Sequence, residues 1–401
     1  MTSEKISILD LGSYKIKLLV ISLNNNNFID IHAKCSIESS GIKKGDVIDI
    51  DRLSLKVKFI IKEVEKELNF KIKKIYVGIN SINFNFLTFG LSRNIGSYEI
   101  EKKKDLQNLI TSATGIFYQN LPNHKIIHFL NSGFYLDKKN YVENPIGLKS
   151  KTLDVNFSFL SLDKNIISNY DKVIDKLGLK VIRYFHSPFA SSILSANQDS
   201  LEQGFVNIDF GHDKISITLY ENSKILYSGT IPIGSSHINN DLIKAIGIDK
   251  ILAEKIKLNF DDILNNNINN LLEEEIKKKK ISLGIIIKIV DARIEEIIDY
   301  IYKNIIYCKS LNKSARKVII NGGGSEIHVF KKRLSKKLNT SVEYSKQSFP
   351  IKDTEFNTFH DYLSCLGIAK LIFFPYKDEI KAFKKNNSGF FTKFYSLFLK
   401  S

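Results

Sequence analysis

The residues whose types and spacing suit chemistry begin near the start of the chain. An acid, a glycine, a hydroxyl, an aromatic ring and an amine share one short turn between two β-rich runs: Asp10, Gly12, Ser13, Tyr14 and Lys15. A glycine lets backbone N–H groups approach an anion closely, so the turn could bind phosphate, with the hydroxyl and the amine as further donors. Asp10 would then face a water-bound divalent cation, because such cations prefer oxygen ligands. An ordinary β-hairpin turn would explain the same residues.

Two later turns repeat this chemistry. The second turn has an acid, a glycine and a histidine between β-rich runs: Asp209, Gly211 and His212. The third turn is glycine-rich and lies between a strand and a helix: Gly322, Gly323, Gly324 and Ser325. A nucleotide could bind there, because N–H groups at a helix N-terminus favour anions. Each turn alone is a weak sign, whereas the ordered set of three is a stronger one, in which Asp209 would share the water-bound cation with Asp10.

The elements that must hold these turns form an internal repeat. Apolar and alternating runs predict a strand meander over residues 6–35, and the same order of strands returns over residues 205–233. Helical spacing of apolar residues predicts helices over residues 51–69 and 327–338. A whole unit that recurs after about 200 residues suggests two similar domains and not a solenoid, whose periods are about 20–50 residues. The sequence therefore predicts a duplicated α/β fold.

Other stretches depart from the repeat. Within residues 81–160, the apolar pattern predicts short strands around 84–89 and 153–160 and one helix over 101–115. Residues 239–310 are predicted to be mostly helical. Residues 81–160 thus differ in texture from the repeated unit.

Length and composition limit the class of protein. The chain has 401 residues, is 43% hydrophobic and 25% charged, and carries a formal net charge of +16. The hydrophobic fraction excludes bulk disorder. The length exceeds what one hydrophobic core normally serves, so two or more domains are expected. Cys35, Cys308 and Cys365 lie far apart in the sequence, which argues against a disulfide framework or a zinc site and favours a reducing cytoplasm. We expect neither a secretory signal nor a membrane-spanning helix, because polar residues interrupt every apolar stretch.

The basic excess has two explanations at the level of sequence. Lys, Ile and Asn are used heavily throughout, as AT-rich codons would cause, or the charge attracts an anionic partner. No zinc finger, recognition helix or aromatic RNA-binding motif accompanies the lysines, so we expect no nucleic-acid partner.

The last residues predict an amphipathic helix behind a polar stretch. Bulky apolar residues cover one broad side of a helical wheel over residues 389–400: Phe390, Phe391, Phe394, Tyr395, Leu397, Phe398 and Leu399. Lys393 and Lys400 lie on the other side, and such a helix suits the interfacial zone of a bilayer. A helix docked on the protein's own core is the alternative. The charged, Asn-rich stretch over 375–388 favours the membrane, because a core helix rarely follows such a tether.

These motifs resemble those of the actin-like ATPase superfamily and, within it, the FtsA family of bacterial cell-division proteins. Residues 8–15 are similar to the family's first phosphate loop, residues 206–211 to the opening of its second, and residues 318–325 to its adenosine loop. The helix around residue 255 resembles the one whose Glu and Lys reach the nucleoside, here Glu254 and Lys257. Residues 144–148 are similar to the N-P-x-G-L motif of the FtsA family, and the terminal helix resembles its membrane anchor.

The resemblance implies an actin-like two-domain α/β fold of duplicated βββαβα units, with an FtsA-type 1C insertion and a C-terminal amphipathic helix. The implied subdomains follow one another along the chain: 1A over 1–80, 1C over 81–160, 1A again over 161–196, 2A over 197–238, 2B over 239–315, 2A again over 316–359, a closing helix of 1A over 360–375, a linker over 376–388 and the membrane helix over 389–401.

The resemblance also implies ligands and partners. ATP and Mg²⁺ would bind at the three turns. The helix over 287–296 resembles the 2B helix that receives the FtsZ C-terminal tail, which implicates Asp291, Arg293 and Glu296. Other copies of the chain in filaments, other divisome proteins and an anionic membrane would be further partners, the last through Phe390, Phe391, Lys393, Phe394, Leu397, Phe398 and Lys400. The chain would tether FtsZ filaments to the cytoplasmic face of the cell membrane at the division site.

The second turn departs from the pattern of the family. Relatives carry D-x-G-G-G-T, whereas this chain has Asp209, Phe210, Gly211, His212, Asp213 and Lys214. Asp213 would place a negative charge near the phosphates unless Mg²⁺ or Lys214 offsets it. We therefore expect ATP binding with weak or absent hydrolysis, and we assign no catalytic residue. A PilM-like pilus-assembly ATPase and a sugar-kinase-like enzyme of the same superfamily are the alternative interpretations.

Overall fold

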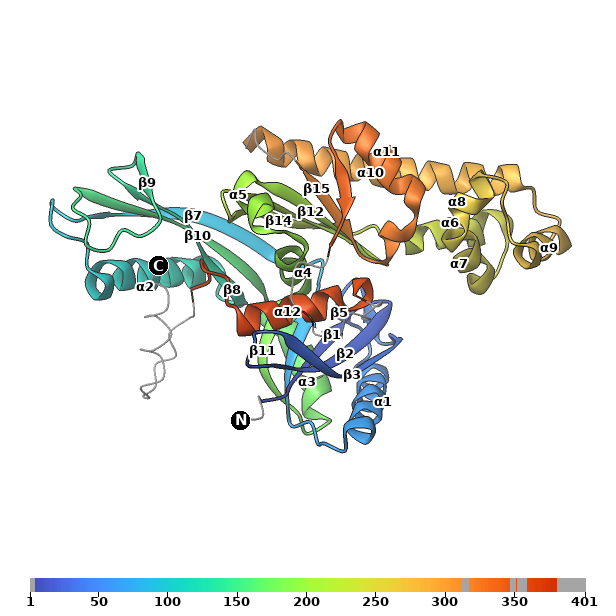
Figure 1. The fold of residues 1–401 in the computed structure, drawn as a ribbon, viewed down its shortest axis with the longest axis horizontal. Coiled ribbons are helices and arrows are strands. Elements are labelled where there is room, and N and C mark those ends of the chain that lie inside the picture. The colour runs from blue at the N-terminus through green and yellow to red at the C-terminus, as the bar shows by residue number, and fades with distance from the viewer. Residues whose placement is uncertain (1–3, 312–316, 347–350, 352–358, 381–401) are drawn as a thin grey trace. The chain divides into compact units, whose positions relative to one another are not determined.

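The computed structural model describes residues 4–311, 317–346, 351 and 359–380 (Figure 1). The chain divides into two compact units: unit 1 comprises residues 1–84 and 163–370, and unit 2 comprises residues 85–162 and 371–401. Among the described residues, no helix is both long and apolar enough to cross a membrane.

The first half of unit 1 is a five-stranded sheet with the order β11-β6-β1-β2-β3. Its strands are β1 (Ile6–Leu11), β2 (Lys15–Leu23), β3 (Ile29–Glu38), β6 (Lys74–Ile79) and β11 (Lys180–His186). Strand β1 runs antiparallel to β2 and parallel to β6, so the turn after β1 lies at the edge where β6 also ends. This half also contains α1 (Ile50–Leu68), α3 (Lys164–Asp175) and a small hairpin of β4 (Ile42–Lys43) and β5 (Asp46–Val47).

The second half of unit 1 repeats this arrangement, with the strand order β14-β13-β12-β15-β16. Its strands are β12 (Phe205–Phe210), β13 (Ile215–Glu221), β14 (Lys224–Ile231), β15 (Val318–Asn321) and β16 (Val342–Tyr344). Strand β12 is antiparallel to β13 and parallel to β15, as β1 is to β2 and β6. The duplication predicted from the sequence is therefore confirmed.

The helices of unit 1 cover these sheets and build the core. Those between β11 and the end of β16 are α4 (Ser187–Ser195), α5 (Gln198–Gln203), α6 (Ser236–Ile246), α7 (Lys250–Leu258), α8 (Phe260–Leu264), α9 (Asn270–Lys278), α10 (Leu283–Leu311), the short helix η2 (Gly323–Glu326) and α11 (His328–Leu338). Helix α10 buries Ile294, Ile297 and Ile301 in a core that includes Phe210 and Phe330. Residues 239–310 are thus mostly helical, as predicted. Farther along, η3 (His360–Tyr362) leads into α12 (Leu363–Phe373).

Unit 2 is a four-stranded sheet, β7-β10-β8-β9, with α2 (Gln107–Asn120) packed on one face. Its strands are β7 (Asn85–Asn94), β8 (His124–Leu136), β9 (Asn140–Val142) and β10 (Thr152–Asp163). The predicted helix over 101–115 is displaced, because a π-helical turn, η1 (Lys102–Leu106), precedes α2. The carboxylate of Asp105 accepts a hydrogen bond from the backbone N–H of Glu101 and fixes this turn.

The residues after α12 pack against unit 2. The backbone N–H of Asn131 donates to the carbonyl of Asp378, and that of Ile380 donates to the carbonyl of Phe129. The carboxylate of Glu379 lies 2.7 Å from Nδ1 of His128, and both side chains are buried. The first residues of the expected linker over 376–388 therefore hydrogen-bond to β8, while residues 381–401 lie outside the described chain.

Candidate functional site

The second and third glycine turns are neighbours because β12 and β15 pair in parallel, with Asp209 opposite Asn321. Gly322 follows directly and has φ +84°, and a Cβ at this position would lie 2.5 Å from an oxygen of Asp209. A Cβ on Gly324 would lie 2.7 Å from the ring of Phe210. These two glycines are therefore required by close packing inside the second half.

The first and second turns meet face to face. The first turn joins β1 to β2 and carries Tyr14, and the second joins β12 to β13 and carries His212. Their rings stack with centroids 4.8 Å apart and an interplanar angle of 22°. Rings at this separation are in direct contact. The fold thus brings together the two turns that the sequence singled out.

The β4–β5 hairpin connects both turns. The backbone N–H of Gly45 donates to Oγ of Ser13 at 3.1 Å, and the backbone N–H of Lys44 donates to Oδ2 of Asp213 at 3.1 Å. The hydroxyl of the buried Tyr170 donates to the carbonyl of Gly45. Sequence reasoning missed this hairpin. The available signal was the pair of glycines, Gly41 and Gly45, which adopt φ +83° and +82°.

The buried carboxylate of Asp10, the half-buried residue Asp209 and the buried ammonium of Lys214 lie at the base of the turns. Burial raises the pKa of Asp10, an effect partly offset by the charge of Lys17 and by a 2.7 Å hydrogen bond from Oγ of Ser187. Burial and the charge of Asp10 raise the pKa of Asp209 to about 6. Burial also lowers the pKa of Lys214 to about 8, against the attraction of Asp213 and other acids. Burial therefore removes water from each charged group, and neighbouring charges and hydrogen bonds offset only part of that free-energy cost.

The residues predicted to reach a nucleoside form a polar cluster near the stacked rings. One carboxylate oxygen of Glu254 accepts from Nζ of Lys257 at 2.8 Å and from the amide of Asn239. Burial alone would raise the pKa of Glu254, but these two bonds hold that pKa below its ordinary value. The charge of Glu254 acts on both Tyr14 and His212. The predicted nucleoside and phosphate residues are therefore close in space.

The two sides of the expected ATP site fit a nucleotide unequally. Glu254 and Lys257 offer the polar groups that a nucleoside requires. In the second turn, by contrast, the N–H of Gly211 already donates to the carbonyl of Lys214, and the carboxylate of Asp213 faces the hairpin. Within the described chain, no cluster of three or more His, Cys, Asp or Glu could hold a metal ion. The nucleoside side fits, whereas the phosphate side is occupied by the chain's own groups.

The charges predicted to bind a partner lie on α10 within ion pairs. Arg293 makes a bidentate pair with Asp241 of α6, including Nη2 to Oδ1 at 2.8 Å, and it also contacts Glu296. Asp291 pairs with Arg333 of α11 at 2.7 Å. These residues thus belong to two separate groups of ion pairs, one between α6 and α10 and one between α10 and α11. The predicted membrane residues over 389–400 lie outside the described residues.

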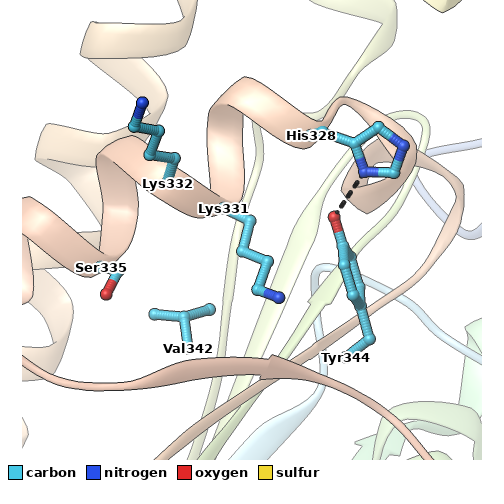
Figure 2. Close-up of a pocket in the computed structure, with 6 residues that line it drawn as sticks. All are labelled: His328, Lys331, Lys332, Ser335, Val342 and Tyr344. Atoms are coloured by element: carbon cyan, nitrogen blue, oxygen red, sulfur yellow. Dashed lines mark hydrogen bonds between the residues drawn. The ribbon is translucent and has the colours of Figure 1, made fainter.

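Two open pockets lie elsewhere on unit 1. One, of about 410 Å³, is lined by side chains of α11 and β16: His328, Lys331, Lys332, Ser335, Val342 and Tyr344 (Figure 2). There Nδ1 of His328 lies 3.0 Å from the hydroxyl of Tyr344, and the ammonium of Lys331 lies 4.4 Å from the centre of that ring. The other, of about 350 Å³, is lined by Ile37, Ser40, Arg52, Leu55, Lys56 and Phe59. None of the predicted site residues lines either pocket.

Comparison with known proteins identifies the family. A family model described as cell division protein FtsA matches residues 206–367, and one described as the SHS2 domain inserted in FtsA matches residues 88–161. Together they span more than half of the chain, and both belong to the same family. The chain belongs to the FtsA family. The recognition made from the sequence motifs is thereby confirmed.

Individual relatives agree with this assignment. Cell division protein FtsA of Buchnera aphidicola subsp. Schizaphis graminum is 26% identical over 83% of this chain and 84% of its own length. The FtsA of Rhizobium meliloti is 21% identical over 81% of this chain and 77% of its own length. FtsA relatives from several bacteria thus align along most of the chain.

Solved structures show the same fold at low identity. The PilM-PilN type IV pilus biogenesis complex contains a chain with a TM-score of 0.67 and 13% identity, which covers 92% of this chain and 98% of its own. MreB5 of Spiroplasma citri bound to ADP has a TM-score of 0.52 and 11% identity, over 93% of this chain and 98% of its own. These likenesses show the fold alone, which is the actin-like fold predicted for this FtsA-family chain.

Proposed function

We propose that this FtsA-family chain links FtsZ filaments to the cell membrane, with its own copies and other divisome proteins as further partners. The observation that carries the proposal is the match of two FtsA models, one to the second half of unit 1 and one to unit 2. The match to the inserted SHS2 domain favours this role over a pilus-assembly ATPase, although a chain of the PilM-PilN complex shares the fold.

In this proposal the membrane contact is made by the terminal segment. Over residues 389–400, large apolar side chains would cover one side of a helix and two lysines the other, in the pattern of an interfacial helix. Lys393 and Lys400 would add attraction to anionic lipid, at about 1 kcal/mol per basic residue near the surface. A single short helix binds reversibly, so firm attachment would come from several chains bound side by side.

The FtsZ contact is proposed on α10. Arg293 is about one-fifth exposed and shares its charge between Asp241 and Glu296. An acidic peptide could replace one of these carboxylates at the exposed rim, because a guanidinium binds several carboxylate oxygens at once. Asp291 and Glu296 would then set which peptide charges are accepted.

ATP and Mg²⁺ are proposed as ligands of the three turns, with the nucleoside beside Glu254 and Lys257. When bound, they would supply a charged link between the two halves of unit 1. The altered second turn argues for slow or absent hydrolysis, since phosphoryl transfer depends on exact positioning. A sugar-kinase activity would need an intact second phosphate loop, which this chain does not have.

Liposome co-sedimentation tests the membrane role. We expect the full chain to pellet with vesicles of phosphatidylcholine and phosphatidylglycerol, and a chain that ends at Ile380 to stay in solution. The cut is placed after Ile380 because residues 376–380 hydrogen-bond to β8 and belong to unit 2. Equal pelleting of the two chains would refute the anchor.

A matched pair of variants separates the apolar side of the segment from its polar side. Phe394→Asp with Phe398→Asp places two charges on the apolar side of the wheel and should release the chain from vesicles. Thr392→Asp with Ser396→Asp adds the same charge on the polar side and should retain most of the binding. If both pairs release the chain equally, general charge repulsion and not helix insertion explains the loss.

A further inference from the structure

The contact between the two glycine turns joins the halves of unit 1 without any ligand. We define this turn contact by the side chains of Tyr14, His212 and Asp213 and by the backbone N–H of Lys44. Tyr14 and Lys44 belong to the first half, and His212 and Asp213 to the second. In an actin-like fold these are the turns expected to hold the phosphates of a nucleotide.

The aromatic pair leaves no room between the turns at this point. The rings of Tyr14 and His212 are stacked at 4.8 Å, and the side chain of His212 is 17% exposed. A phosphoryl group between the rings would have to push them apart. Because stacked rings in contact are stabilised by burial and by their own attraction, that displacement costs free energy.

Asp213 supplies an anion where the phosphates would be expected. Its Oδ2 accepts the N–H of Lys44 at 3.1 Å, and its Oδ1 accepts from the hydroxyl of Ser236 at 3.3 Å. Backbone N–H groups in turns are also the donors that bind phosphate in proteins. The carboxylate thus occupies a backbone donor that would otherwise be open to an anion, and its charge repels an incoming polyphosphate.

Further polar groups reinforce the closure. The ammonium of Lys214 lies against the hairpin, since a Cβ on Gly45 would be 2.5 Å from it. The amide of Asn80 in the first half donates to Oγ of Ser216 in the second at 3.2 Å. The second half therefore contacts the first through a ring, a carboxylate, an ammonium and a hydroxyl.

We propose that Tyr14, His212 and Asp213 take the place of a nucleotide's phosphates, so that unit 1 closes without ATP and ATP binds only when these side chains move. This rests on the proposed ATP site, whose affinity it would set. Small residues at the three positions should open the phosphate side while leaving Glu254 and Lys257 intact.

Two measurements on the full chain test this proposal. In the first, urea unfolding without nucleotide compares Tyr14→Ala, His212→Ala and the double variant. We expect the double variant to lose less stability than the sum of the two single losses, because either change breaks the same contact. Strict additivity would overturn the ligand-free closure.

In the second measurement, calorimetry with ATP and Mg²⁺ compares the wild type with a triple variant, Tyr14→Ala, His212→Ala and Asp213→Ser. We expect the triple variant to bind ATP at least about tenfold more tightly. Tyr141→Ala, which removes an exposed ring from unit 2, is the matched control and should leave the affinity unchanged.

The outcomes distinguish this proposal from the ATP site on which it rests. Equal ATP affinity of the wild type and the triple variant would overturn the exclusion of phosphate by these side chains. Non-additive unfolding with no ATP binding by either chain would refute the proposed ATP site and support the ligand-free closure.

Discussion

At the scale of single residues, the carboxylate of the half-buried Asp209 makes the free energy of unfolding depend on pH. Its pKa in the folded chain is about 6, above the ordinary value of 3.8, because burial and Asp10 disfavour the charge. The folded state therefore keeps a proton that the unfolded state loses over this range, and stability falls as pH rises through it. At neutral pH, the charged Asp209 therefore lowers the free energy of unfolding.

We predict that Asp209→Asn removes this penalty. Relative to the variant, the wild type should lose free energy of unfolding between about pH 4 and 6, by at most about 3 kcal/mol for a pKa raised from 3.8 to about 6. Urea unfolding at several pH values measures the difference. A difference that stays constant across this range would contradict the raised pKa.

Asp249→Asn is the control of opposite sign. Asp249 caps α7, and the backbone N–H of Leu252 donates to its carboxylate and holds its pKa below the ordinary value. Its stabilising effect is present above the unfolded pKa and is lost as pH falls through the folded one. The variant should therefore lose stability relative to the wild type as pH rises, opposite to Asp209→Asn.

At the scale of elements, the third turn contains one glycine that packing requires, Gly324, and one that it does not, Gly323. A Cβ on Gly324 would approach the ring of Phe210 to 2.7 Å, whereas one on Gly323 would meet nothing within 4 Å. We predict that Gly324→Ala destabilises the chain by about 1–3 kcal/mol through overpacking, and that Gly323→Ala is nearly neutral. Urea unfolding of both variants tests this, and equal losses would show that Phe210 does not set the constraint.

Periodic apolar residues allowed much of the fold to be predicted. Helix α1 and strand β12 appear as predicted because their buried faces follow periods that the sequence displays directly. Strand β8 was missed, since it buries His128 and Asn131, polar residues that interrupt its pattern. Burial of His128 depends on Glu379, a partner distant in the sequence. Local pattern carries no information about such a pairing.

The candidate site was predictable in its parts and not in its assembly. The three turns were found because glycine and acidic residues mark them, and the structure brings them together. The stacking of Tyr14 on His212 was not predictable, because it depends on how two separate sheets are placed. Asp213 was expected near phosphates, whereas in the structure its carboxylate accepts the N–H of Lys44. No sequence motif had indicated the hairpin that carries Lys44.

At the scale of the whole molecule, the net charge of +16 acts unevenly. Several basic side chains of the second half are already paired with acids, among them Arg293, Arg333 and Lys337. Such pairs weaken the field that a distant anionic surface would sense. In the proposed role, attraction to an anionic membrane would therefore come mainly from the lysines near the end of the sequence and not from the total charge.

The proposed linking of FtsZ filaments to the membrane requires one chain to bind the membrane and FtsZ at the same time. With FtsZ from the same organism and anionic vesicles, we expect the wild type to pellet FtsZ. The Arg293→Gln variant should still pellet with the vesicles but bind the FtsZ tail about tenfold more weakly, a loss of about 1.4 kcal/mol in binding free energy.

The chain ending at Ile380 should bind the tail peptide in solution but should not pellet FtsZ with the vesicles. Lys337→Gln, which breaks an exposed pair with Asp299 and a contact with the ring of Tyr302, is the control and should behave as the wild type. Undiminished pelleting of FtsZ by Arg293→Gln would place the FtsZ contact elsewhere than on α10, whereas failure of the shortened chain to bind the peptide would mean that the two ends do not act independently.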